Sequence, residues 1–259
     1  MRFHIAILCL LCVPLLVQAA TPEAHGLEIA REMERRDTGF HDFESRMTML
    51  LRNRQGEESL RSMRYKTLEV EHDGDKTLLI FDEPLDVKGT ALLSFSHKVG
   101  DDDQWLYLPA LKRVKRIASS NKSGPFMGSE FAYEDIASQE VEKYTYRYIG
   151  EDRFEGKSAF LIDRFPVDAN SGYTRQRVWV DVNRYIPLKI DFYDRKQTLL
   201  KTLFFRGYRQ YLGQYWRPDQ LYMVNHQTGK STLLSWQKYE FRTGLNDSDF
   251  NRNSLKRAR

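Results

Sequence analysis

The side chains that most often do chemistry in proteins are sparse and widely separated in this sequence. Five histidines lie beyond the N-terminal region, and no two of them have the spacing of a metal-binding pair: His25, His41, His72, His97 and His226. The run 101–103 holds three consecutive aspartates without the spaced oxygen ligands of a calcium loop, which is typical of a solvated turn. The motifs of serine hydrolases, zinc peptidases, P-loop proteins and dinucleotide-binding proteins are also missing. The sequence therefore predicts no catalytic residue, no metal site and no cofactor.

A basic run over residues 111–117 is the strongest local charge pattern. Basic pairs at 112–113 and 115–116 alternate with apolar residues, and Trp105 and Tyr107 lie just before them. Three interpretations are open: phosphate and stacking contacts with a nucleic acid, a strand edge that meets anionic lipid headgroups, and cations paired with acidic neighbours on a solvated strand. The third is the simplest. An export signal at the N-terminus argues against the first.

The N-terminus has the pattern of a secretory signal peptide. Arg2 is followed by an apolar run over 5–17, and small residues then fit cleavage after Ala19 or Ala20. The apolar run is shorter than the roughly 20 residues that a membrane-spanning helix needs. The sequence therefore predicts a signal peptide over 1–19 and a single mature domain over 20–259.

Both cysteines of the chain, Cys9 and Cys12, lie inside this leader. The mature chain is therefore expected to form no disulfide and no cysteine metal site. Leu8 and Leu11 precede the two cysteines, where a lipid-anchored protein would need a small residue. We therefore expect an exported, unanchored domain that is large enough to bury a core without disulfides.

The predicted elements are one helix followed by many short strands. Thr21 and Pro22 fit the start of a helix, apolar residues at 27, 30 and 33 share one of its faces, and Gly39 fits its end. Beyond Gly39, apolar residues alternate with polar ones, and short turns separate the runs. The predicted strands cover 43–51, 60–70, 77–81, 90–95, 105–108, 144–148, 159–165, 177–182, 188–193, 199–208, 216–224 and 232–241. Turns at this spacing predict an antiparallel meander.

The segment 117–139 interrupts this rhythm. It is too rich in Gly, Ser and Pro for a strand, yet it carries large apolar residues that should be buried. Long loops with apolar side chains of their own are often lids or binding loops. A plug that closes one end of the sheet is an equally good interpretation, and the sequence leaves both open.

Several segments resemble, in order, the signatures of a known family. They are Pro84-x-Asp86-x-Lys88-Gly89-Thr90, the stretch 105–117, the stretch 126–135, Trp179-x-Asp181, Tyr185-Ile186-Pro187-Leu188 and Asp194. Together they resemble the LolA-like family of outer-membrane lipoprotein-sorting proteins, over essentially the whole mature chain. Lys196 departs from the pattern, because a glycine is expected in the turn after Asp194. This hairpin is therefore expected to be longer or differently shaped.

The resemblance implies a mainly β fold, an incompletely closed antiparallel β-barrel (a half-barrel) with helices and a loop lid over its concave face. It also implies an apolar cavity for acyl chains and a periplasmic carrier of lipid or acylated lipoprotein toward the outer membrane. An inner-membrane exporter of the resistance-nodulation-division type is an implied partner, and nucleic acid is not. The alternative is a docking subunit of such an exporter that binds no cargo, and an enzyme is the third hypothesis.

Large apolar side chains are the candidate ligand contacts, because acyl chains need apolar area rather than specific polar chemistry. Methionines suit such a cavity because their flexible side chains adapt to irregular ligands. The candidate cavity and lid residues are Trp105, Tyr107, Phe126, Met127, Phe131, Trp179, Phe192, Phe204, Met223 and Trp236. Alternation fixes which residues of a strand share a face, but not which face is concave.

Overall fold

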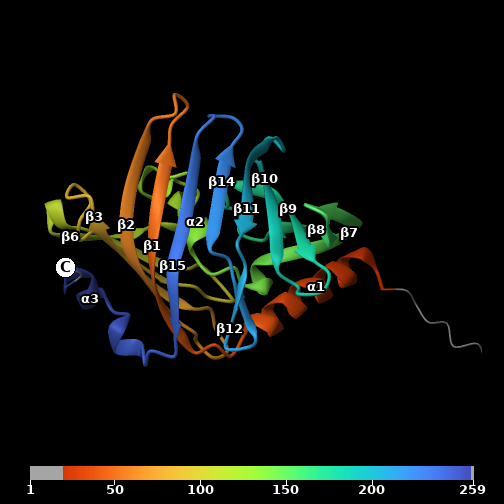
Figure 1. The fold of residues 1–259 in the computed structure, drawn as a ribbon, viewed down its shortest axis with the longest axis horizontal. Coiled ribbons are helices and arrows are strands. Elements are labelled where there is room, and N and C mark those ends of the chain that lie inside the picture. Colours follow the sequence, from red (N-terminus) through yellow and green to blue (C-terminus); the bar gives the residue numbers. More distant parts are fainter. Residues whose placement is uncertain (1–19, 258–259) are drawn as a thin grey trace, which may run out of the picture.

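The computed structural model describes residues 20–257, and its main feature is one large antiparallel sheet (Figure 1). Its 13 strands have the order β6-β5-β4-β3-β2-β1-β15-β14-β11-β10-β9-β8-β7. The first and last strands of this order do not pair, so the sheet stays open, and it forms the half-barrel that the family resemblance implies. A separate short ribbon pairs β12 with β13.

The strands are short to medium in length and are joined mostly by tight turns. Their bounds are β1 Asp42–Arg52, β2 Glu58–Leu68, β3 Lys76–Glu83, β4 Ala91–Phe95, β5 Asp103–Leu108, β6 Arg113–Ile117, β7 Tyr144–Phe154, β8 Lys157–Pro166, β9 Tyr173–Asp181, β10 Pro187–Asp194, β11 Leu199–Arg206, β12 Arg209–Tyr211, β13 Tyr215–Arg217, β14 Gln220–Asn225 and β15 Ser231–Phe241. The helices are α1 Pro22–Asp37, α2 Tyr133–Ile136 and α3 Arg252–Arg257. No helix within 20–257 is long and apolar enough to cross a membrane.

Two arms of consecutive strands meet at the centre of the sheet. β1 pairs with β15, so that Met47 lies opposite Trp236, although the two residues are far apart in sequence. From this seam the strand numbers rise to β6 on one side and fall from β15 to β7 on the other. The two strands that pair in the middle of the sheet are therefore the first and the last in the sequence.

Helix α1 lies across the concave side of the arm that ends in β7 (Figure 1). The Thr21 hydroxyl accepts a hydrogen bond of 3.2 Å from the Ala24 amide and caps the helix, as the sequence predicts. Gly26 allows the close approach, because a Cβ at this position would lie 2.8 Å from the Tyr148 amide nitrogen. Ile29 and Ala30 on the same helix are also buried.

Most predicted strands are present, with three informative differences. The predicted strand 216–224 is divided into β13 and β14 around Pro218, which lacks an amide proton for a sheet ladder. Helix α3 is not predicted, because a six-residue helix is too short to show clear periodicity. In the turn after Asp194, Gln197 adopts the left-handed conformation with φ of 61°. The Asp194 carboxylate accepts bonds from the amides of Lys196 and Thr198, so the turn forms without glycine. The predicted signal peptide over 1–19 lies outside the described residues.

Apolar side chains pack on both faces of the sheet. The larger cluster fills much of the concave side, and α1 and the segment 118–143 cover it. On the convex side, Phe250 and Leu255 near the C-terminus pack on Leu93 and Trp105. A second convex cluster joins Trp179 to Leu188. The concave side is the one that can enclose a ligand.

Candidate functional site

One half of the concave side is filled by the first part of the segment 118–143, around Phe126. The side chains of Phe126 and Phe131 are fully buried, and the ring of Phe126 lies 5.9 Å from that of Phe81 on β3. Met127 has a left-handed backbone with φ of 48°, and its carbonyl accepts a hydrogen bond of 2.5 Å from Arg61. In this half the segment is a plug, which is one of the two forms that the sequence leaves open.

A buried polar network fixes the same segment to the sheet. The Asp135 carboxylate accepts a 2.7 Å bond from the Lys201 ammonium and a 2.9 Å bond from the Tyr173 hydroxyl. Lys201 also donates to the Glu130 carbonyl, and the side chains of Lys201 and Asp135 are only 5% and 6% exposed. A buried charge without its partner is strongly destabilising. These contacts therefore hold residues 130–135 in one position.

The other half of the concave side is hollow. A cavity of about 500 Å³ lies beneath the C-terminal part of α1. Its wall is mostly apolar and includes Ala30, Met33, Met47, Leu79, Ile136, Val141, Ile162, Val178, Ile190, Phe205, Leu221 and Leu234. A volume of this size falls in the range of typical ligand sites, which is about 300–1,000 Å³.

Charged groups gather where the cavity meets α1. Arg217 forms an ion pair with Asp37, and its guanidinium lies 5.2 Å from the ring centroid of Phe40. Arg36 of α1 similarly lies 4.2 Å from the ring of Tyr185. Each arginine is thus held by an aromatic ring, and the cavity has an apolar interior with a charged rim.

Asp75 is an acidic residue of this cavity wall. Its loss of solvent, together with the nearby carboxylates of Glu140, Glu69 and Asp37, raises the pKa of Asp75 to about 8. The Asp75 side chain is therefore mostly protonated and uncharged at neutral pH. An uncharged carboxyl group can donate a hydrogen bond as well as accept one.

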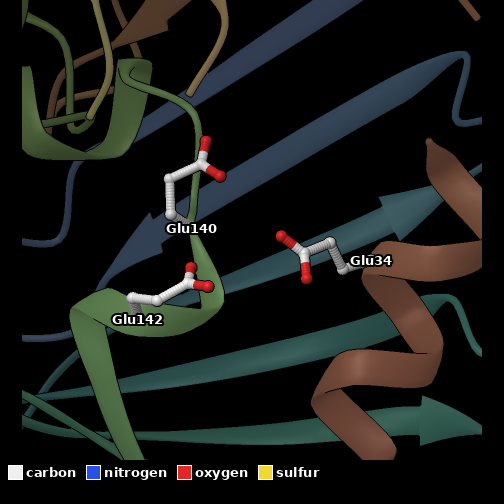
Figure 2. A group of neighbouring side chains, drawn as sticks. All are labelled: Glu34, Glu140 and Glu142. Atoms are coloured by element: carbon white, nitrogen blue, oxygen red, sulfur yellow. The ribbon is translucent and has the colours of Figure 1, made fainter. Parts of the chain in front are cut away.

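Three further carboxylates lie close together beside the cavity. Figure 2 shows Glu34 of α1 pointing toward Glu140 and Glu142, which precede β7. Their oxygen atoms lie within 4.8 Å of one another. Lys98 donates a 3.0 Å bond to Glu34, so a protein cation already faces the group, and burial raises the pKa of Glu140. The arrangement is therefore explained without a metal ion.

The predicted ligand contacts divide into three sets. Phe131 and Trp236 line the cavity. Phe126, Met127, Phe192 and Met223 belong to the concave cluster but lie outside the cavity wall, in its filled part. The remaining four lie on the convex face: Trp105, Tyr107, Trp179 and Phe204. Ligand contact by Phe131 and Trp236 stays a prediction.

Residues of the cavity wall that were not among the candidates come from α1, from residues 135–141 and from most strands of the sheet. Ala30 and Met33 of α1 line the cavity, and both belong to the apolar helix face that the sequence shows. Tyr65 and Leu79 line it from β2 and β3. The helical spacing of apolar residues could have identified Ala30 and Met33. Tyr65 and Leu79 could not be identified, because alternation along a strand does not show which face is concave.

Comparisons with known proteins place the chain among related sequences and folds. A family model described only as an uncharacterized protein matches residues 73–257. No curated protein has a significantly similar sequence.

Solved structures are more informative. A protein from Vibrio parahaemolyticus, described as a candidate outer-membrane lipoprotein-sorting domain, is 58% identical with a TM-score of 0.88. The match covers 90% of this chain and 98% of that one. A DUF1329 family protein from Desulfovibrio piger is 32% identical with a TM-score of 0.86, over 91% and 100% of the two chains. A LolA superfamily protein from Nitrosomonas europaea, at 20% identity and a TM-score of 0.70 over 91% and 100%, shares the fold.

Proposed function

Because the chain belongs to the DUF1329 family of outer-membrane lipoprotein-sorting-like proteins, with a LolA-like fold, we propose that it carries lipid or lipoprotein acyl chains. The acyl chain would occupy the cavity beneath α1 during transport through the periplasm toward the outer membrane. The observation that carries this proposal is the unfilled, mostly apolar cavity of about 500 Å³.

The energetics of the cavity suit an acyl ligand. Each methylene that leaves water for an apolar wall contributes about 0.8 kcal/mol, so a chain can be held without specific polar contacts. The charged rim with Arg217 and Arg36 lies where a polar headgroup would meet solvent. Phe131 and Trp236 are the proposed contacts among the residues that the sequence singles out.

A docking subunit without cargo would be expected to have a filled interior. The hollow half of the concave side therefore favours a carrier over such a subunit. An inner-membrane exporter of the resistance-nodulation-division type is proposed as a partner on the basis of the family resemblance alone. Co-purification of the tagged protein with such an exporter from detergent-solubilised inner membranes tests this part.

Filling the cavity tests the carrier function. Ala30→Trp places an indole ring where the helix faces the cavity, while Arg31→Trp places the same ring on the exposed side of the same helix. We expect Ala30→Trp to weaken binding of a fluorescent fatty acid at least about tenfold, since the ring would displace several methylenes of the ligand. Arg31→Trp should bind as the parent protein does.

Mass spectrometry of an organic extract supplies the second measurement. The protein purified from the periplasm should release lipid, and Ala30→Trp should release much less. Equal unfolding midpoints for the parent and both variants would show that the fold is intact. Absence of lipid from the parent extract, together with no fatty acid binding, would contradict the proposal.

A further inference from the structure

Three of the most exposed large apolar side chains lie at one end of the sheet. Leu60, Leu85 and Leu111 are 60%, 87% and 68% exposed. They come from the start of β2, the β3–β4 loop and the β5–β6 turn. The strand register brings these segments together, as Ser62 lies opposite Glu83, Ala91 opposite Tyr107 and Leu108 opposite Arg113.

The turn that carries Leu111 has a defined shape. Pro109 begins a single 3₁₀ turn, and the Lys112 amide closes it with a 3.0 Å bond to the Pro109 carbonyl. Lys112 has a left-handed backbone with φ of 47°, which is unfavourable for a residue with a side chain. An exposed leucine on a strained, proline-initiated turn is difficult to explain by packing, because it buries little of its own surface.

Cations without acidic partners surround this end of the sheet. Lys88, Lys112, Arg113 and Lys115 are exposed, and within residues 20–257 no salt bridge involves any of them. Arg116 is the one basic residue of β6 that is paired, with Asp103. Of the three interpretations of the basic run, pairing with acidic neighbours therefore applies to Arg116 alone.

The C-terminal helix adds further exposed cations close to β6. α3 packs beside β4, β5 and β6, and it lies near β6 in Figure 1. Arg252, whose guanidinium lies 5.3 Å from the ring of Trp105, and Lys256 are exposed on it. Glu83 and Asp86 are exposed near Leu85 and lower the positive charge there, but not at β6. The charge excess is therefore centred on the edge strand.

We propose that this corner, formed by Leu60, Leu85, Leu111 and the basic strand β6, docks on a lipid bilayer that carries anionic headgroups. The leucines would enter the headgroup layer while the cations of β6 face the lipid phosphates. Apolar side chains flanked by cations are the combination that binds such interfaces. Each cation near an anionic membrane surface strengthens binding roughly fivefold.

Edge protection is the competing explanation for the cations. Lysine and arginine on an edge strand prevent it from pairing with the edge of another molecule. That role explains charges on β6, which is one edge of the 13-stranded sheet. It does not explain the three exposed leucines at the same end. The bilayer accounts for both features.

Vesicle binding tests the inference on the mature chain. The probes are vesicles of phosphatidylcholine alone and of an equal mixture with phosphatidylglycerol, with bound protein measured by cosedimentation. We expect binding to the mixed vesicles only, and weaker binding as salt rises because exposed charges are screened. Lys112→Gln with Arg113→Gln and Lys115→Gln should lower affinity about a hundredfold, roughly fivefold for each cation.

The matched control removes three exposed lysines from other hairpins: Lys157→Gln, Lys196→Gln and Lys230→Gln. This control variant lowers the net charge by the same amount as the variant of β6 and its turn. Its binding to the mixed vesicles should be nearly unchanged. Leu111→Ser alone should weaken binding about tenfold, which edge protection does not predict.

Several results would overturn the inference. The first is equal binding of the parent protein to neutral and anionic vesicles. The second is a loss of affinity in the control variant as large as that in the Lys112, Arg113 and Lys115 variant. The third is that the latter variant dimerises but still binds vesicles. Absence of vesicle binding would point to a protein partner, and tighter binding to a single-stranded oligonucleotide would point to nucleic acid. Ala30→Trp should bind vesicles normally, so this test is independent of the cargo cavity.

Discussion

The two halves of the concave side are built from one sheet and one set of residue types, but one is filled and the other is hollow. Beneath residues 124–131, the fully buried Phe126 completes a core, and Phe131 lies at the border between this core and the cavity. Beneath the C-terminal part of α1, apolar strand residues instead face a cavity of about 500 Å³. The difference arises from the covering element and not from the sheet.

The covering elements differ in how they are attached. The plug segment is joined to β9 and β11 by a buried network around Asp135 and Lys201. Helix α1 is held to β7 by close packing at Gly26, and at its C-terminal end by the pair of Arg217 with the half-exposed Asp37. The plug is therefore a fixed part of the fold, and under the proposed function cargo would enter on the α1 side.

The largest expected difference between the two halves concerns these charges. Lys201→Met leaves the buried Asp135 carboxylate without its cation and should lower the free energy of unfolding by about 3–5 kcal/mol. Asp37→Asn removes the half-exposed partner of Arg217, whose side chain is only 12% exposed, but the new amide oxygen can still accept a hydrogen bond, so the cost should be smaller, about 1–2 kcal/mol. Urea unfolding of both variants measures the contrast. Equal costs would show that the plug is held no more firmly than the cavity rim.

A matched pair of phenylalanine truncations probes packing in the two halves. Phe126→Ala should cost about 3–5 kcal/mol of unfolding free energy, because it opens a void in a filled core. Phe205→Ala should cost about 1–2 kcal/mol, because Phe205 already borders the cavity and is partly exposed. Chemical denaturation gives both values. A larger cost for Phe205→Ala would mean that the hollow half is collapsed in solution.

Asp75 should make the hollow half sensitive to pH. The pKa of Asp75 is raised to about 8 in the folded protein from an ordinary value of 3.8, so the folded state holds the proton more tightly. Its contribution to stability is therefore fully present below about pH 4 and is lost as pH rises toward about 8.

Asp75→Asn removes this dependence. The variant should gain about 1–3 kcal/mol over the parent at pH 8, and much less at pH 4, because one unit of pKa corresponds to about 1.4 kcal/mol and Asp75 is partly exposed. Unfolding curves at the two pH values measure the difference. A gain that does not change with pH would show that Asp75 is ionised throughout.

Local patterns predicted much of the fold because they report local physics. The Thr21 cap, the strand alternation and the turns appear where the sequence indicates them. Alternation could not say which face of a strand is concave, and Trp179 shows the consequence. Trp179 lies on the convex face, while Val178 beside it lines the cavity. The turn at Gln197 shows a second limit, since a carboxylate can stabilise a turn that usually takes glycine.

The sequence by itself determined the mainly antiparallel β character, the absence of recognisable catalytic motifs, and the resemblance that identifies the family. Only the tertiary structure decided where the space for a ligand lies. The seam between β1 and β15, the plug over one half and the helix over the other join residues that are distant in the chain. A cavity is a volume left between such elements, and no local pattern encodes it.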